Sequence, residues 1–212
     1  MKPMKDFLHA SLLANQLVLS PEMEEKCLAY LDLLQKWNRI YNLTAIHDAK
    51  ESVLLHIIDS LLIRPYLHGS RCIDVGTGAG LPGIPLALTC PDRHFVLLDS
   101  NSKKTRFLSQ VLYELPLKNV EIVHARVENF NPAEKFDSIL SRAFASLQAM
   151  LEATRHLVSE QGYFLAMKGI YPEAEINAIS TEFTVTAVQR LTISGLDVNR
   201  HLVCITKGAT IG

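Results

Sequence analysis

The sequence predicts an α/β fold with a mostly parallel sheet, an antiparallel last strand and a helical N-terminal extension. From Arg71 to Lys168, apolar runs typical of strands alternate with helical stretches, which favours parallel strands with helices on both faces. After Lys168, two strand-like segments are separated only by Gly195–Asn199, so the chain closes with a β-hairpin. Before Arg71, apolar residues recur at helical spacing. We therefore expect a helical extension at residues 1–66, packed on the core, and an α/β domain at residues 67–212.

Composition agrees with a folded chain of this size and narrows the possible partners. Of the 212 residues, 48% are hydrophobic and 20% are charged, which allows a large core. Because 21 Lys and Arg are balanced by 22 Asp and Glu, a nucleic-acid partner would need a local basic patch. The four cysteines are scattered without a C-x-x-C pair, so we expect buried free thiols and no metal site.

The N-terminus does not read as a secretory signal. His9, Asn15 and Gln16 interrupt its apolar stretch. No apolar run approaches the roughly 20 residues that span a bilayer. We expect a cytoplasmic monomer without a membrane partner.

The N-terminal extension is predicted to contain three helices. The first has an apolar face at helical spacing, and the second begins at Ser20 as the capping residue, with Pro21 at the first helical position. The third runs from about Lys50 to Ile63. The connector Lys36–Ala45 is rich in aromatic residues and asparagines, which we interpret as core anchors and helix caps.

The α/β part is predicted element by element from apolar runs and their spacing. Short apolar runs bounded by polar residues or glycine predict strands, and longer periodic stretches between them predict helices. The strand candidates are Cys72–Val75, Phe95–Asp99, Val120–His124, Ser138–Ser141, Tyr163–Met167, Thr184–Ile193 and His201–Lys207, and the helix candidates are Ile84–Thr89, Lys103–Leu115 and about Leu147–Leu157.

A glycine-rich turn follows the first predicted strand. The apolar run that contains Asp74 leads into glycines at alternate positions, Gly76, Gly78 and Gly80, and then into an apolar helix start. Glycine lets a ligand touch the main chain, and the free N–H groups of the next helix face the turn. The turn therefore predicts a nucleotide-cofactor site at the carboxyl edge of the sheet.

Two classes of cofactor fit this turn. Gly78–Gly83 matches the G-x-G-x-x-G of dinucleotide-dependent oxidoreductases, whereas Asp74–Gly80 matches the [D/E]-x-G-x-G-x-G of S-adenosylmethionine-dependent methyltransferases. An acid here would repel a pyrophosphate but attract an ammonium and a sulfonium. Asp99, 23 residues beyond Gly76, suits the ribose of either cofactor.

The late hairpin separates the two classes. Class I methyltransferases have a Rossmann-like sheet of seven strands in which the antiparallel seventh strand lies beside the fifth. A dehydrogenase would instead need a second βαβαβ half, for which too few residues follow Lys168. The sequence thus favours a class I methyltransferase over an NAD-dependent oxidoreductase.

With these residues in place, the chain resembles the small-subunit ribosomal RNA methyltransferase G family, also called glucose-inhibited division protein B, over nearly its whole length. The most specific mark is Leu81-Pro-Gly-Ile-Pro85 after the glycines. The resemblance implies S-adenosylmethionine-dependent methylation of N7 of a guanine in the 530 loop of bacterial 16S rRNA, in the small ribosomal subunit. Further marks are Lys36-Trp-Asn-x-x-x-Asn-Leu-Thr44, His56-Ile-Ile-Asp-Ser60, Leu98-Asp-Ser100, Lys104-x-x-Phe-Leu108, Arg126-Val-Glu128, Ser141-Arg-Ala-Phe-Ala145, Lys168-Gly169 and Arg200-His-Leu202.

The resemblance also implies roles for single residues. The turn, the ends of the second and third strands and the end of the fourth strand would hold the cofactor, with Asp99 on the ribose and the third-strand end on the adenine. Arg142 would bind the cofactor, although by position it could also face the guanine. The cofactor residues implied are Gly76, Gly78, Leu81, Asp99, Val127, Glu128 and Arg142.

The implied chemistry needs no catalytic base, because guanine N7 already carries an in-plane lone pair. Catalysis would consist of aligning N7 with the methyl group in a dry pocket. The candidates for RNA contact are Lys168, Arg200, Lys103 and Asn38. Three of them have a structural alternative: a strand-end lysine for Lys168, a solvated helix face for Lys103 and a helix cap for Asn38. A non-catalytic RNA-binding protein is the remaining alternative function.

Overall fold

The computed structural model of the chain describes residues 2–142 and 144–208. Ala143 of the Ser141–Ala145 motif and the last four residues of the predicted domain therefore lie outside the described residues. Within the described part, the chain forms one sheet of seven strands in the order β3-β2-β1-β4-β5-β7-β6. The strands are β1 (Arg71–Val75), β2 (His94–Asp99), β3 (Val120–His124), β4 (Phe136–Ser141), β5 (Val158–Lys168), β6 (Phe183–Arg190) and β7 (His201–Lys207).

The strand directions confirm the predicted fold class. β1 pairs in parallel with β2 and β4, and β4 pairs in parallel with β5. β7 is antiparallel to both of its neighbours and lies between β5 and β6. The last strand is therefore inserted beside the fifth, as the late hairpin predicted.

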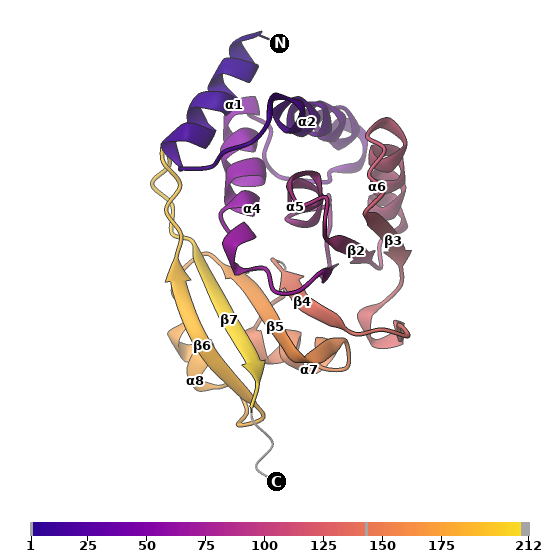
Figure 1. Ribbon diagram of the computed structural model, residues 1–212, viewed down its shortest axis with the longest axis vertical. Coiled ribbons are helices and arrows are strands. Elements are labelled where there is room, and N and C mark those ends of the chain that lie inside the picture. Colours follow the sequence, from indigo (N-terminus) through magenta and orange to yellow (C-terminus); the bar gives the residue numbers. More distant parts are fainter. Residues whose placement is uncertain (1, 143, 209–212) are drawn as a thin grey trace.

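Helices cover both faces of the sheet (Figure 1). On one face, α7 (Leu147–Thr154) packs on alternate residues of the central strands, including Ile73 and Ile139. On the other, α5 (Gly83–Thr89) contributes Leu86 to a core that contains Cys72 and Leu140. This alternation of burial along each strand follows from the two-residue period of β structure. The other helical segments of this part are α6 (Ser102–Glu114), η3 (Val127–Asn129) and α8 (Glu173–Asn177).

The N-terminal extension shares its hydrophobic core with α5 and α6. Its segments are α1 (Lys2–Ala14), α2 (Pro21–Tyr41), α3 (Ala49–Ser52), η1 (Val53–Ile58), α4 (Asp59–Leu61) and η2 (Arg64–Tyr66). Leu8, Leu12 and Leu34 of α1 and α2 belong to the same cluster as Ile84 and Phe107. Figure 1 also shows the β6–β7 connection reaching the end of α1, where Ser194 donates its backbone N–H to Asn15 Oδ1 over 2.8 Å.

The third predicted helix contains a change of winding that the sequence did not reveal. Its central residues Val53–Ile58 form a π-helix, and the N–H of Asp59 accordingly bonds the carbonyl of Leu54, five residues back. Such insertions are frequently found at functional sites. Here the wider turn sets the direction of Asp59, a buried residue that follows directly.

The extension reaches the glycine turn through a buried tyrosine. The hydroxyl of Tyr30 on α2 donates to the carbonyl oxygen of Ala79 over 2.8 Å, and both residues are buried. This bond joins the glycine turn to a helix 49 residues earlier in the chain. The extension therefore helps to hold the turn in place.

Removing this hydroxyl should weaken the whole protein. Tyr30→Phe leaves the buried carbonyl of Ala79 without a partner, which should lower the free energy of unfolding by about 1–2 kcal/mol. Urea denaturation measures this difference. Tyr113→Phe, on a ring that is 82% exposed, is the matched control and should have no effect; equal effects of the two changes would contradict the role of the Tyr30 bond.

Candidate active site

The glycine turn joins β1 to α5 at the carboxyl edge of the sheet. Gly76, Gly78 and Gly80 all have positive φ angles, of 69°, 62° and 91°. A Cβ at Gly80 would lie 2.5 Å from the side chain of Ile84, whereas one at Gly76 would meet nothing within 4 Å. Gly80 therefore serves close packing, and Gly76 leaves open space beside the main chain for a ligand.

Asp74 lies beneath the turn and is fully buried. Its Oδ2 accepts hydrogen bonds from the hydroxyl of Thr77 over 2.7 Å and from the N–H of Gly83 over 2.9 Å. Its Oδ1 has no hydrogen-bond partner among the described residues. Burial raises the pKa of Asp74 to about 6, against the lowering effect of those two bonds. One oxygen of the carboxylate beneath the turn is therefore without a hydrogen-bond partner in the part of the chain that the structure describes.

This pKa predicts a pH dependence for cofactor binding. Only the ionised carboxylate of Asp74 attracts an ammonium, so the affinity for S-adenosylhomocysteine, which keeps that group, should rise as pH rises through about 6. Calorimetry between pH 5 and pH 8 measures it. In Asp74→Asn this part of the pH dependence should disappear, and an unchanged profile in that variant would contradict the assignment.

The same shift has the opposite effect on the stability of the protein without cofactor. Because the pKa of Asp74 is raised from 3.8 to about 6 on folding, its protonated form favours the folded state. That contribution is fully present below pH 3.8 and is lost as pH rises through about 6.

A cavity of about 190 Å³ opens beside Gly76, between the ends of β1, β2 and β3. Asp99 lies at its base, where Oδ2 accepts from the N–H of Gly78 over 2.9 Å and Oδ1 accepts from the N–H of Asn101 over 2.8 Å. Nζ of Lys104 lies 3.6 Å from Oδ2. A carboxylate offers about four acceptor positions, so capacity remains for a ribose diol. The cavity is lined by Val75, Gly76, Leu98, Asp99, Ser100, Ala125, Arg126, Val127, Glu128 and Phe144.

The predicted cofactor residues are distributed unevenly around this cavity. Gly76, Asp99, Val127 and Glu128 line it, and Gly78 is bonded to Asp99. Leu81 instead packs into the core shared with the N-terminal extension. Arg142 lines a second cavity instead. The contacts of Leu81 and Arg142 with a cofactor stay predictions.

A second cavity of about 190 Å³ lies at the ends of β4 and β5, and cations surround it. Its lining includes Arg142, Lys168 and Arg200, which the fold brings together from three separate segments, and Asp59 from α4. Asp59 is buried; its Oδ2 lies 3.6 Å from Nη1 of Arg142 and its Oδ1 lies 3.3 Å from Nε of Arg200. One carboxylate thus faces both guanidinium groups.

These contacts are ion pairs without hydrogen-bond geometry. Neither oxygen of Asp59 nor Nε of Arg200 has a hydrogen-bond partner among the described residues. Nη1 of Arg142 donates instead to the carbonyl of Leu55, in the π-helix, over 3.1 Å. Burial raises the pKa of Asp59, and the two arginines oppose that rise. The cavity therefore holds polar atoms that can still bind a ligand.

Lys168 is positioned by an acid from the next helix. Its Nζ donates to Oε2 of Glu175 over 2.8 Å, and the same oxygen accepts the N–H of Leu147 at the start of α7 over 2.6 Å. Lys168 is therefore paired, but it still lines the cavity. No sequence pattern marks Glu175, whereas Asp59 lies inside the His56–Ser60 motif and could have been singled out there.

Two histidines near the cation cavity, His56 and His201, are buried. His56 in the π-helix is buried, its Nε2 lies 3.2 Å from the hydroxyl of Thr44, and burial together with Arg142 lowers its pKa to about 4. It is neutral at physiological pH. Nδ1 of His201 lies 2.9 Å from the carbonyl oxygen of Gly169. Among the described residues, no cluster of three His, Cys, Asp or Glu side chains could hold a metal ion.

Two predicted RNA residues lie apart from the cation cavity. Asn38 is buried, and its amide both donates to and accepts from the backbone of Thr44 at 2.9 Å, so its side chain holds the connector in place. Its contact with RNA stays a prediction that this burial disfavours. Lys103 is exposed near the start of α6, beside the Lys104 that faces Asp99.

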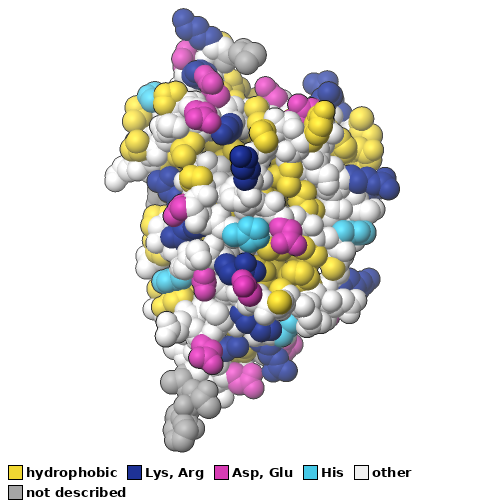
Figure 2. Space-filling view, turned by 45° about the vertical axis from the view of Figure 1, so that its right-hand side comes forward, with side chains coloured by type: hydrophobic (Ala, Val, Ile, Leu, Met, Phe, Trp, Pro, Cys, Tyr) yellow, Lys and Arg dark blue, Asp and Glu magenta, His cyan; other side chains and the backbone are white. Residues whose placement is uncertain are grey.

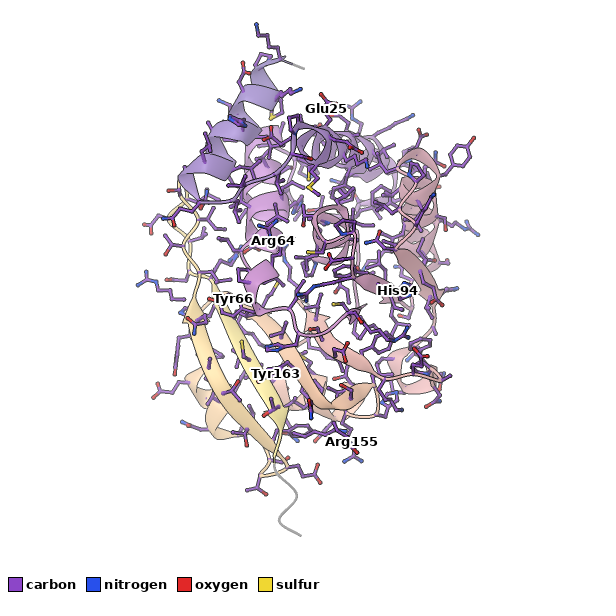
Figure 3. The ribbon with its side chains drawn as sticks, viewed as in Figure 1. Glu25, Arg64, Tyr66, His94, Arg155 and Tyr163 are labelled. Atoms are coloured by element: carbon purple, nitrogen blue, oxygen red, sulfur yellow. The ribbon has the colours of Figure 1, made fainter. Side chains whose placement is uncertain are left out.

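The surface carries no single-signed field on the face seen in Figure 2, where Lys and Arg alternate with Asp and Glu. In Figure 3, the labelled His94 lies at the start of β2, and Arg64 and Tyr66 belong to η2, which leads into β1. These residues lie at the end of the sheet opposite to both cavities.

Solved structures share this architecture. A glycopeptide N-methyltransferase complexed with S-adenosylmethionine matches with a TM-score of 0.63 and 10% identity, covering 72% of this chain and 87% of that one. A SAM-dependent methyltransferase from Aquifex aeolicus matches with a TM-score of 0.60 and 18% identity, covering 73% and 92%. The strand order and these likenesses show the fold of a class I methyltransferase, and the glycine turn and the cavity over Asp99 lie together at the carboxyl edge of its sheet.

Sequence relatives show to which family of methyltransferases the chain belongs. The family model for rRNA small subunit methyltransferase G matches residues 23–203. The chain belongs to this family. A ribosomal RNA small subunit methyltransferase G from Idiomarina loihiensis is 47% identical over 204 residues, 96% of this chain and 99% of that protein. One from Escherichia coli O1:K1 is 49% identical over 187 residues, 88% of this chain and 90% of that protein. The protein is an S-adenosylmethionine-dependent rRNA methyltransferase.

Proposed function

We propose that the protein methylates N7 of a guanine in the 530 loop of 16S rRNA, on the small ribosomal subunit. Membership of the rRNA small subunit methyltransferase G family carries the proposal. The cation cavity supports it, because Arg142, Lys168 and Arg200 can bind guanine O6 or a neighbouring phosphate at the carboxyl edge of the sheet.

S-adenosylmethionine supplies the electrophilic methyl group when it is bound. Gly76 and Asp99 would hold the adenosine part, with Val127 and Glu128 beside the adenine. The free oxygen of Asp74 suits the ammonium. The protein's own contribution is to position the two reactants and to exclude water.

The guanine would enter from the side of Arg142 and Arg200. Their unpaired or weakly paired N–H groups suit the O6 acceptor next to N7. The lone pair of N7 attacks without prior loss of a proton, so no side chain has to act as a base. Neutral His56 and the ion-paired Asp59 are consistent with this division of roles.

The remaining assignments belong to the same proposal. Leu81, Gly78 and Arg142 would complete the cofactor site. Lys103 would contact the RNA from its exposed position on α6, whereas the RNA contact predicted for Asn38 has no support from its buried side chain. Residues 1–66 act as an extension that fixes the glycine turn, and residues 67–212 form the methyltransferase domain. The protein would act as a monomer in the cytoplasm. In the part of the chain that the structure describes, no helix is long and apolar enough to span a bilayer.

Mass mapping of 16S rRNA tests the target. RNA from cells lacking the protein should miss one methyl group, and the purified protein should restore it at guanine N7 on small-subunit particles from those cells. A methyl group restored at another atom or another nucleotide would contradict the proposal. Analytical ultracentrifugation measures the molecular mass in solution and should give that of a single chain.

A further inference from the structure

Two neighbouring large apolar side chains are exposed directly beyond β5. Ile170 is 75% exposed and Tyr171 is 54% exposed, in the connection between β5 and α8. The other large apolar side chains that are exposed in the described chain, such as Tyr113 and Val18, stand singly in the sequence. An adjacent pair of this kind is a candidate contact surface.

Contacts with the strand beside it fix this connection. His201 at the start of β7 places Nδ1 2.9 Å from the carbonyl oxygen of Gly169. Its ring meets the ring of Tyr171 edge to face, with 5.7 Å between centroids and 84° between planes. One side of the tyrosine is therefore supported while about half of its surface remains in contact with solvent.

The exposed pair lies at the border of the cation cavity. Lys168 and Gly169, which line that cavity, directly precede Ile170 and Tyr171. Arg200, which also lines the cavity, directly precedes the His201 that supports the tyrosine ring. The cavity carries three cations against the carboxylates of Asp59 and Glu175, so its formal charge favours an anionic partner.

A supported, exposed aromatic ring beside cations is the arrangement that binds single-stranded nucleic acid. Bases that leave their stack are bound on aromatic faces, while cations hold the phosphates. A guanine in an RNA loop must be turned out of its stack before N7 can reach a methyl donor inside a cavity. The bases next to it then lose their neighbours and need a new surface.

We propose that Ile170 and Tyr171 form a stacking surface for an unpaired base next to the target guanine in the substrate RNA. The proposal rests on the proposed function and adds a binding site for a second nucleotide. Tyr171 provides the aromatic face, Ile170 extends its apolar area, and Lys168 and Arg200 bind the phosphate between the two nucleotides.

Steady-state kinetics on small-subunit particles that lack the methyl group test this surface. Tyr171→Ala should raise KM for the particle by on the order of 10-fold, because one stacked base is lost. Its kcat and its affinity for S-adenosylmethionine should stay at the wild-type values. Tyr171→Trp and Tyr171→Phe keep an aromatic face and should keep the wild-type KM. Tyr113→Ala, which removes an exposed tyrosine at the C-terminal end of α6, is the matched control and should keep the wild-type KM.

Three results would contradict the proposal that Ile170 and Tyr171 form a stacking surface. They are an unchanged KM in Tyr171→Ala, an equal rise in KM for Tyr171→Ala and Tyr171→Trp, and photo-crosslinking of residue 171 to a ribosomal protein instead of RNA. A different measurement, mass mapping of the RNA, tests the proposed function. If mass mapping places the methyl group elsewhere than guanine N7, the KM comparison on the particle that is methylated still decides whether Tyr171 binds a base.

Discussion

Replacing Gly76 by aspartate is expected to abolish S-adenosylmethionine binding. A Cβ at this position meets nothing within 4 Å because it would extend into the cavity beside Asp99. The added carboxylate fills the space that the adenosine needs and lies close to the charge of Asp99. The φ of 69° at Gly76 adds backbone strain for any side chain. Calorimetry with S-adenosylmethionine should show no measurable heat of binding.

Backbone strain and loss of cofactor space can be separated with a second glycine. Gly195 between β6 and β7 has a φ of 94°, and its nearest neighbour is the side chain of Leu54 at 3.8 Å. Gly195→Asp therefore carries comparable strain away from the cofactor cavity, and it should keep cofactor binding. Retained turnover in Gly76→Asp, or equal loss of binding in both variants, would mean that the open space at Gly76 does not receive the cofactor.

The second large effect is expected at Asp59. Asp59→Asn keeps the size of the side chain but removes the charge that faces Arg142 and Arg200. The two guanidinium groups then repel each other and lose their common orientation, and small misplacements in an active site cost about 10²-fold in rate. Single-turnover methylation of small-subunit particles should slow by about that factor.

The control for Asp59 is another ion pair that contains an arginine, Arg71 with Glu134. Glu134→Gln removes an exposed carboxylate whose Oε2 lies 3.1 Å from Nη1 of Arg71, and it should leave the rate unchanged. Circular dichroism establishes whether Asp59→Asn is folded. If it is not, Arg200→Gln tests the same cavity while the buried carboxylate of Asp59 keeps Arg142 as its ion-pair partner. A wild-type rate in a folded Asp59→Asn protein would contradict the positioning role.

Most of the fold could be predicted from the sequence because its elements follow local rules. β3 and β7 have the predicted bounds, and the other strands differ from prediction by one to five residues at their ends. β5 begins at Val158, five residues before the predicted start at Tyr163. The prediction missed these residues because Ser159–Gln161 form a polar stretch without a strand pattern. The short α8 was missed because five residues are too few to show a helical period.

The π-helix was missed for a different reason. Every residue of Val53–Ile58 is buried, so the apolar pattern has no face and gives no information about the number of residues per turn. The position of Asp59 therefore could not be derived, although the residue lies in a motif that the sequence already showed.

The sequence by itself determined the parts of this protein that depend on neighbouring residues. These are the glycine turn with Asp74 beneath it, the acid at the end of β2, and the hairpin that separates a methyltransferase from a dehydrogenase. Only the tertiary structure decided which charges meet. Asp59, Arg142 and Arg200 lie far apart in the chain. Asp59 comes within 3.6 Å of each arginine because the insertion of β7 beside β5 places the three segments at one edge of the sheet. An ion pair depends on the distance between two atoms in space, and local sequence patterns fix only the distance along the chain.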